Sequence, residues 1–515
     1  MLNSFINLHF KISFIFLILA LFFGLLYSFQ LLSLFGHLFT PENARSIHIS
    51  LMLYGFPPLM LSMLPFSLFD KDGLQSEVGV KYLNIYFILW YIFLIFMIFS
   101  LAFGDRRNLA FYDFPYELNF LLVGAGVFYI LSILKFIKLY DKKPLWVKVS
   151  LAVVVMAPFS LLVLMNPRYG QVQNMALGPH GDNTLGMSFF LLALYYLNIK
   201  LASKQDFKPR FHIFWVIPLL FYIASVFYRS FINHLNYDQE WFLQWLSILY
   251  LPVLFFWIKD SNIKIKENMF LFISIFAFIF ADIEGNILFI PKIRLLFHRD
   301  DLVIGHAHIA VGIGFLFLCF SVVKRYFNIK NSYIIIWASL LTLIGLTLSL
   351  SGFYQANMMS LDTRFLWKFR TFFGIILFIY ISWFYTSFFN IKKIDMIRLY
   401  HLIGFLSDGI GGLVLLFFAA PLYKILDINF HMGYQVIVFG FMSSVGFMHL
   451  LGFLNKTYQT PMANATSMAR IITSALFFAL VKAGFIGYIG YTISAYDLFY
   501  ALIYIIMTNA LYKSI

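Results

Sequence analysis

The stretch DLVIGHAHIAVGIGFLF, from Asp301 to Phe317, places two histidines near the start of a long apolar run. In an α-helix successive residues are about 100° apart, so His306 and His308 point to nearly opposite sides and do not chelate one metal. They can instead ligate two different metals, as a pair of haems flanking one transmembrane helix would require. The alternative interpretation is two polar residues near a membrane interface. The positions of the other polar residues decide between the two.

The composition is that of a membrane protein. Of the 515 residues, 62% are hydrophobic and 12% are charged, and the mean hydropathy is +0.85. Soluble globular proteins have about a quarter of their residues charged. The net charge of +14 does not indicate nucleic-acid binding, because the basic residues lie in short loops between apolar runs. The single cysteine, Cys319, excludes a disulfide framework, a thiolate metal site and covalent c-type haem attachment, so any haem must be held by histidine.

Apolar runs of about 20 residues, the length that a bilayer requires, recur along the whole chain. Twelve lie before residue 390, near 10–36, 48–68, 82–103, 117–139, 147–166, 180–198, 211–233, 239–258, 267–290, 303–324, 332–352 and 367–389. Four more lie near 400–423, 432–454, 468–489 and 492–511. The sequence therefore predicts an all-α polytopic membrane protein, with a twelve-helix domain over residues 1–392 and an appended four-helix membrane domain over 393–515. The first run is too long for a signal-peptide core, and we expect it to be retained as a spanning helix.

The basic residues predict the orientation. Lys and Arg concentrate in the loops after the even-numbered helices, so these loops are expected to be cytoplasmic. Polar residues then gather at the outward ends of four helices, namely His48 on the second, His180 and Asp182 on the sixth, Asn233 and His234 on the seventh, and His306 and His308 on the tenth. Ionisable residues inside a membrane are costly and are usually functional. These groups are therefore expected to share one layer.

Histidines on helices 2, 6, 7 and 10 of a twelve-helix chain resemble the ground plan of the haem-copper oxidase superfamily. The local sequences look most like the catalytic subunits of C-type cytochrome c oxidases and nitric oxide reductases, over about residues 10–390. ENARSIHISLMLYGF is similar to the family's second helix, with Arg45 three residues before a low-spin haem histidine, His48. IEGNILFIPKIRLLFHRDDLVIGHAH is similar to its stretch from helix 9 to helix 10, and it contains Glu284 and His298.

This resemblance implies the cofactors and their setting. His48 and His308 would hold a low-spin haem b, and His306 would hold a high-spin haem b. Arg370 in FLWKFRTFFG, Arg45 and His298 would pair with haem propionates, since guanidinium groups bind carboxylates bidentately. A role of Arg370 as an interfacial anchor stays open. The expected location is a bacterial inner membrane, spanned many times, with the haem layer toward the periplasmic side.

The chain departs from the family pattern at the second metal. Family oxidases hold copper with one histidine on helix 6 and two adjacent histidines on helix 7. Here Asp182 takes the helix 6 position if Asn-Thr-Leu-Gly is the anchor, and His180 is the ligand in another register. Helix 7 keeps His234 but has Asn233 as its neighbour. A carboxylate with an imidazole suits a harder ion, so non-haem iron is favoured over copper.

A second departure concerns the reaction. The tyrosine that oxidases of this type crosslink to a copper ligand is matched by Phe227, and the adjacent Tyr228 points about 100° away on a helix. This loss disfavours four-electron cleavage of O2. The resemblance therefore favours an oxidoreductase that reduces two NO to N2O and water. Glu284 would relay protons, since burial brings a carboxyl pKa toward neutrality, although a helix-packing hydrogen bond is the alternative role.

Other functions stay open from the sequence. A divergent terminal oxidase would reduce O2 with Tyr228 and an unusual copper site. A nitric oxide dismutase would yield N2 and O2, and a non-catalytic haem protein would lack the second metal. The electron donor would be a c-type cytochrome, a cupredoxin subunit or quinol. No internal repeat is expected, NKTYQTPMANATSMAR is expected to be a polar loop, and His9, His401 and His449 are expected to be interfacial or hydrogen-bonded.

Overall fold

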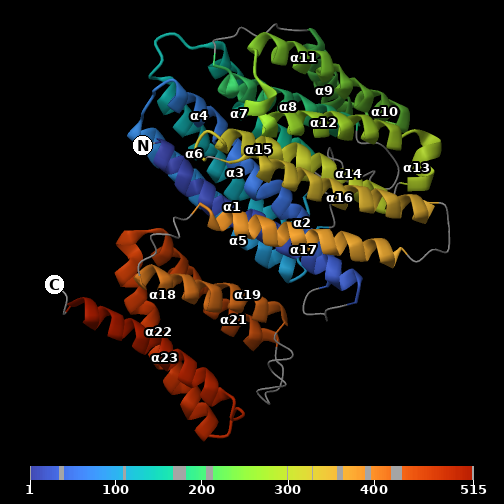
Figure 1. Cartoon of the computed structure of the whole chain (residues 1–515). Helices are drawn as coiled ribbons and strands as arrows, with labels where there is room; N and C mark the ends of the chain where they lie inside the picture. Colours follow the sequence, from blue (N-terminus) through green and yellow to red (C-terminus); the bar gives the residue numbers. More distant parts are fainter. Residues whose placement is uncertain are drawn as a thin grey trace. The chain divides into compact units, whose positions relative to one another are not determined.

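The structure is a computed structural model, and it describes residues 2–33, 40–107, 112–165, 181–204, 213–297, 300–327, 329–356, 363–388, 396–418 and 432–512. Within these ranges the chain forms helices and no strand (Figure 1). Thirteen of the helical spans in the described residues are long and apolar enough to cross a membrane. The prediction of an all-α polytopic membrane protein is confirmed.

The chain divides into two compact units. Unit 1 comprises Met1–Phe35 and Thr40–Tyr385, and unit 2 comprises Gly36–Phe39 and Thr386–Ile515. The sequence placed its domain boundary at residues 392 and 393, a few residues after this division.

In its described residues, unit 1 has seventeen α-helices and four short segments of other helical types, which Figure 1 colours from blue to orange. Its first half contains α1 (Leu2–Leu31), α2 (Pro41–Tyr54), α3 (Phe56–Leu61), α4 (Leu64–Lys71), α5 (Glu77–Ala102), η1 (Tyr116–Leu118), α6 (Asn119–Ile137), α7 (Leu145–Met165) and α8 (Gly181–Ala202). Its second half contains α9 (Ile213–Phe231), α10 (Tyr237–Trp245), η3 (Leu246–Leu249), α11 (Tyr250–Ser261), η4 (Ile265–Glu267), α12 (Met269–Leu288), α13 (Pro291–Phe297), α14 (Asp301–Ala307), η5 (His308–Phe315), α15 (Leu316–Val323), α16 (Asn331–Ala356) and α17 (Arg364–Thr386).

The second and the tenth of the predicted spans are not simple α-helices. The second span is divided into α2, α3 and α4, because prolines lack the backbone N–H that would continue the helix: Pro57 and Pro58 at the start of α3, and Pro65 at the start of α4. The tenth span continues from α14 through a π-helical segment, η5, which begins at His308. π-Helical turns are rare and are frequent at functional sites.

Unit 2 contains α18 (Met396–Gly404), η7 (Phe405–Ile410), α19 (Gly411–Phe418), α21 (Met432–Leu454), α22 (Lys456–Lys482) and α23 (Gly490–Tyr512). The segment η7 is a second π-helical turn, and it joins α18 to α19 in one span.

The prediction of a polar loop after residue 454 is wrong. NKTYQTPMANATSMAR forms the N-terminal part of α22, where the Asn455 side chain caps the helix by accepting a hydrogen bond from the backbone N–H of Thr457 at 3.0 Å. The polar side chains of Gln459, Thr466 and Arg470 are buried in this helix. Polarity along this stretch therefore reflects buried contacts within unit 2 and not exposure in a loop.

A close approach between α14 and α16 fixes the turn that bears His306 and His308. A Cβ atom on Gly352 would lie 2.3 Å from the backbone nitrogen of Leu302, and one on Gly305 would lie 2.8 Å from the carbonyl oxygen of Gly345. Small residues at helix interfaces allow this kind of backbone contact in membrane proteins.

We expect Gly352→Ala to lower the thermal stability of the detergent-solubilised protein, because the added methyl group meets backbone atoms that cannot rotate away. Overpacking of this kind costs about 1–3 kcal/mol. The matched control is Gly126→Ala on α6, where an added Cβ has no neighbour within 4 Å. That variant should be unchanged or slightly more stable, since alanine favours helix. Equal melting temperatures for the two variants would contradict the close contact.

Candidate functional site

His48 on α2 and His308 at the start of η5 face each other. Their ring centroids are 6.2 Å apart and the ring planes differ by 27°. The Nδ1 atom of His48 lies 2.7 Å from the carbonyl oxygen of Ala20, and Nδ1 of His308 lies 2.8 Å from that of Ile304. A carbonyl oxygen only accepts, so each Nδ1 carries the proton and each neutral ring keeps an unprotonated Nε2.

Local structure gives each ring this orientation. His308 reaches back one turn to the carbonyl of Ile304 on α14. His48 crosses to α1, where a Cβ on Gly24 would lie 2.7 Å from its ring, so glycine leaves the space that the imidazole occupies. The chain thus holds both imidazoles by their Nδ1 atoms, which is how proteins orient histidines that bind metal through the other nitrogen.

His306 contacts a different part of unit 1. Its Nδ1 lies 3.3 Å from Oε2 of Glu284 on α12, and both side chains are partly buried. A Cβ on Gly285 would lie 3.1 Å from Cε1 of His306, so a second glycine accommodates this ring. The two histidines therefore contact different elements, α12 for His306 and α2 for His308, as the spacing of two residues predicts.

The residues expected for a second metal are only partly described. His180 and His298 lie outside the described residues. Asp182 is the second residue of α8, and its side chain is outside the description. Asn233 and His234 follow α9 in a segment without regular secondary structure and are both exposed, with Oδ1 of Asn233 accepting from the backbone N–H of His234 at 2.8 Å. Among the described side chains, no group of three His, Cys, Asp or Glu residues is placed to hold a metal.

The two arginines differ in their surroundings. Arg45 is exposed on α2. Arg370 on α17 is buried, its Nε donates to Oγ of Ser28 at 3.2 Å, and its Nη2 has no hydrogen-bond partner. Its guanidinium carbon also lies 5.6 Å from the ring centroid of Trp367. A buried guanidinium with an unused N–H group is suited to bind an acidic ligand group.

Asp301 is a structural residue that the sequence did not single out. Its Oδ2 accepts from Oγ of Ser351 at 2.6 Å, from Nε1 of Trp367 at 2.6 Å and from Nε2 of Gln355 at 3.1 Å. These bonds attach the first residue of α14 to α16 and α17. In the sequence, Asp301 is recognisable only as a carboxylate at the start of an apolar run. Its hydrogen-bond partners lie far along the chain.

Asp282 on α12 is a second carboxylate that sequence reasoning missed. Its two carboxylate oxygens accept from Oγ of Ser247 at 2.9 and 2.7 Å, and Asn286 donates to its backbone carbonyl at 2.8 Å. It lies two residues before Glu284, inside the same apolar span. Residues two positions apart on a helix point to nearly opposite sides, so the hydrogen bonds of Asp282 and Glu284 involve different partners, Ser247 for Asp282 and His306 for Glu284.

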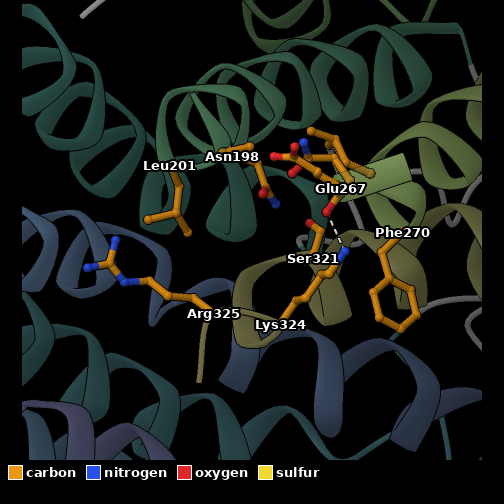
Figure 2. A pocket seen from close by; sticks show the side chains of 10 residues that line it. Asn198, Leu201, Glu267, Phe270, Ser321, Lys324 and Arg325 are labelled. Carbon is orange, nitrogen blue, oxygen red and sulfur yellow. Dashed lines mark hydrogen bonds between the residues drawn. The ribbon is translucent and has the colours of Figure 1, made fainter. Parts of the chain in front are cut away.

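A separate cavity lies at the other end of the tenth span. It has a volume of about 240 Å³, and Glu267, Ser321, Lys324 and Arg325 contribute to its lining (Figure 2). Figure 2 shows Lys324 directed to Glu267, where it donates to the backbone carbonyl. The Lys204 side chain, 2.8 Å from the Glu267 carboxylate, holds the pKa of that carboxyl below its usual value. This basic region belongs to the side predicted to be cytoplasmic, away from the histidines.

No known protein-family model matches the chain, and no curated protein sequence matches it. Any function for this chain therefore rests on its own residues and on the resemblance of its motifs.

The protonation of Asp300, at the start of α14, is expected to make the folding stability depend on pH. Asp300 caps α14, with Oδ1 accepting from the Leu302 N–H at 2.9 Å, and burial raises its pKa to about 6. The folded state then binds a proton more tightly than the unfolded state. Stability should therefore fall as the pH rises from about 4 to about 6.

We expect Asp300→Asn to melt at a higher temperature than the wild type at neutral pH, because asparagine still caps the helix and carries no charge. The difference should vanish below about pH 4, where aspartate is protonated in both states. Thermal unfolding in detergent across this range measures the effect. The control is Asp141→Asn at an exposed position. A difference between wild type and Asp300→Asn that stays constant with pH would show that Asp300 does not titrate as described.

Proposed function

We propose that the protein is a membrane-bound nitric oxide reductase. It would reduce two NO to N2O and water at a high-spin haem b and a non-haem metal, iron in preference to copper, with electrons from a low-spin haem b. The observation that carries the proposal is the facing pair His48 and His308, each with Nδ1 committed to a backbone carbonyl. When bound, the haems and the metal supply the electrons and the site where NO binds.

The geometry of the pair fits a single iron. A metal–imidazole bond is about 2 Å long and the ring centre lies about 1 Å beyond the nitrogen, so two rings on opposite sides of one metal have centres about 6 Å apart. The observed separation is 6.2 Å. Both Nε2 atoms are unprotonated in the neutral rings and are therefore able to bind a metal. The buried guanidinium of Arg370, with its unused Nη2, fits a haem propionate.

The environment of His306 fits an axial ligand of a second haem. A carboxylate at Nδ1 fixes the ring orientation and raises the basicity of Nε2. Glu284 occupies this position at 3.3 Å. The proposal therefore gives Glu284 two roles, orienting His306 and relaying protons to the site.

The second metal site completes the proposal. Asp182 and His234 would hold the ion, with Asn233 or His180 as a third ligand. A carboxylate in this set favours iron. Phe227 is exposed and cannot supply the electron and proton that O2 cleavage requires, whereas Tyr228 packs beside a cluster that contains Leu185 and Tyr222. These positions favour NO over O2 as the substrate.

We expect His48→Ala and His308→Ala each to abolish the low-spin haem spectrum of the purified protein. Loss of an axial ligand should reduce low-spin haem content by more than the 10–100-fold that is typical for loss of an outer partner. The control is His9→Ala, since His9 is also buried but bonds to Tyr91 at 2.9 Å. A low-spin spectrum that survives in both variants, or is lost equally in the control, would refute the assignment.

Metal analysis with NO consumption tests the reaction itself. We expect two haems b and one further iron per chain, and one N2O for two NO with an artificial electron donor. Asp182→Ala should lose the third metal and lower NO turnover at least about 100-fold, with both haem spectra retained. The control is Asp141→Ala, at an exposed position.

The alternatives give different results in the same assay. O2 consumption without N2O would identify a terminal oxidase, and N2 with O2 as products would identify a dismutase. Two haems with neither a third metal nor turnover would contradict the reductase and leave a non-catalytic haem protein.

A further inference from the structure

Unit 2 contains a buried cluster of charged side chains within its membrane-spanning helices. Arg470 on α22 lies between two carboxylates, with Nη2 2.5 Å from Oδ2 of Asp408 on η7 and Nη1 2.7 Å from Oδ1 of Asp497 on α23. The side chains of Arg470, Asp408 and Asp497 are 4%, 10% and 13% exposed. Two carboxylates and one guanidinium leave one excess negative charge when all three are ionised.

Two histidines adjoin this cluster. Nε2 of His401 on α18 lies 2.8 Å from the carbonyl oxygen of Gln459, so this nitrogen donates and Nδ1 of a neutral His401 accepts. Nδ1 of His449 on α21 lies 3.1 Å from Nδ1 of His401 and must be the donor. The remaining nitrogen, Nε2 of His449, is then unprotonated.

That nitrogen points toward the ion cluster. Nε2 of His449 lies 3.8 Å from Oδ2 of Asp408, has no hydrogen-bond partner, and belongs to a side chain that is fully buried. Two acceptors, a lone pair and a carboxylate oxygen, thus face each other with no hydrogen between them. Such an arrangement in a low-dielectric interior is costly unless a proton is shared.

The histidines are seated by glycines on the opposite helix. A Cβ on Gly404 of α18 would lie 2.5 Å from the ring of His449, and one on Gly452 of α21 would lie 2.4 Å from the ring of His401. The two helices therefore exchange a histidine for a glycine at each contact. The matching hexapeptides HLIGFL (401–406) and HLLGFL (449–454) encode this exchange, and the sequence analysis missed this short repeat.

The backbone around Asp408 is also unusual. Asp408 lies in the π-helical turn η7, and a Cβ on Gly446 would lie 2.0 Å from the backbone nitrogen of Gly409. This close contact with α21 places the turn against the helix that bears His449.

We propose that this cluster is a proton-binding site, which holds one exchangeable proton between Oδ2 of Asp408 and Nε2 of His449. The proton comes from water, forms an O–H or N–H bond within the pair, and changes the net charge of the cluster from −1 to zero. It turns two facing acceptors into a hydrogen bond, so the 3.8 Å separation shortens when the proton binds. Unit 2 thus takes up and releases a proton inside the membrane, independently of the function proposed for unit 1.

The other titratable groups around Asp408 and His449 determine how strongly the pair binds the proton. Arg470 stabilises the ionised carboxylates, and its guanidinium carbon lies 4.1 Å from the ring centroid of Tyr500. Asp497 pairs with the same guanidinium, so the positive charge of Arg470 is divided between the two carboxylates. The groups that face the pair are Tyr400 and His401 on α18, Arg470 on α22, and Tyr496, Asp497 and Tyr500 on α23.

Infrared titration of the full chain in lipid nanodiscs tests the site, with the proton itself as the ligand. The wild type should show a carboxyl signal and an imidazole signal that change over the same pH range. Together these two signals should account for the binding of one proton per chain. Asp408→Asn and His449→Gln should each remove this coupled signal. His449→Gln keeps the ion pairs of Arg470 intact, so it is expected to fold even if Asp408→Asn does not.

The control is Asp141→Asn, which alters an exposed carboxylate and should leave the coupled signal unchanged. A wild-type signal that persists in His449→Gln would overturn the shared proton. The absence of any titrating signal in the folded wild type would do the same, because the cluster would then serve only to hold the helices together.

Discussion

The requirement that polar groups inside a bilayer find partners within the protein governs both units. Unpaired amide and imidazole groups cost several kcal/mol in hydrocarbon, so the backbone is helical and the polar side chains turn inward. His48, His308 and His401 each satisfy one ring nitrogen with a backbone carbonyl. Asp301 collects three donors at one oxygen. Chemistry is then confined to the few atoms that these internal bonds leave unused.

Both candidate sites follow from this rule. In unit 1 the committed Nδ1 atoms of His48 and His308 leave two nitrogens that can bind metal. In unit 2 a chain of hydrogen bonds from Gln459 through His401 leaves Nε2 of His449 facing a carboxylate. The unprotonated nitrogens that remain are those that we propose bind a metal in unit 1 and a proton in unit 2. The difference lies in the neighbour of the free nitrogen, a second imidazole or an acid.

The sequence predicts elements that depend on local patterns and fails on contacts between distant residues. Apolar runs identify the helical spans, and helical spacing alone separates His306 from His308. The polar start of α22 was read as a loop, because its buried partners on other helices are invisible in a single run. Asp282, Asp301 and the pairing of His401 with His449 were missed for the same reason. The environments of Asp182, His180 and His298 stay predictions.

The π-helical turns determine where the side chains of both candidate sites point. A π-helical hydrogen bond joins residues five apart instead of four, so the turns η5 and η7 are each wider than an α-helical turn. One residue more in a turn rotates the side chains after it by about 100° relative to those before it. Each turn includes one of the key polar residues, His308 or Asp408. The π-helical turns thus set the direction of these side chains within helices that otherwise continue across the span.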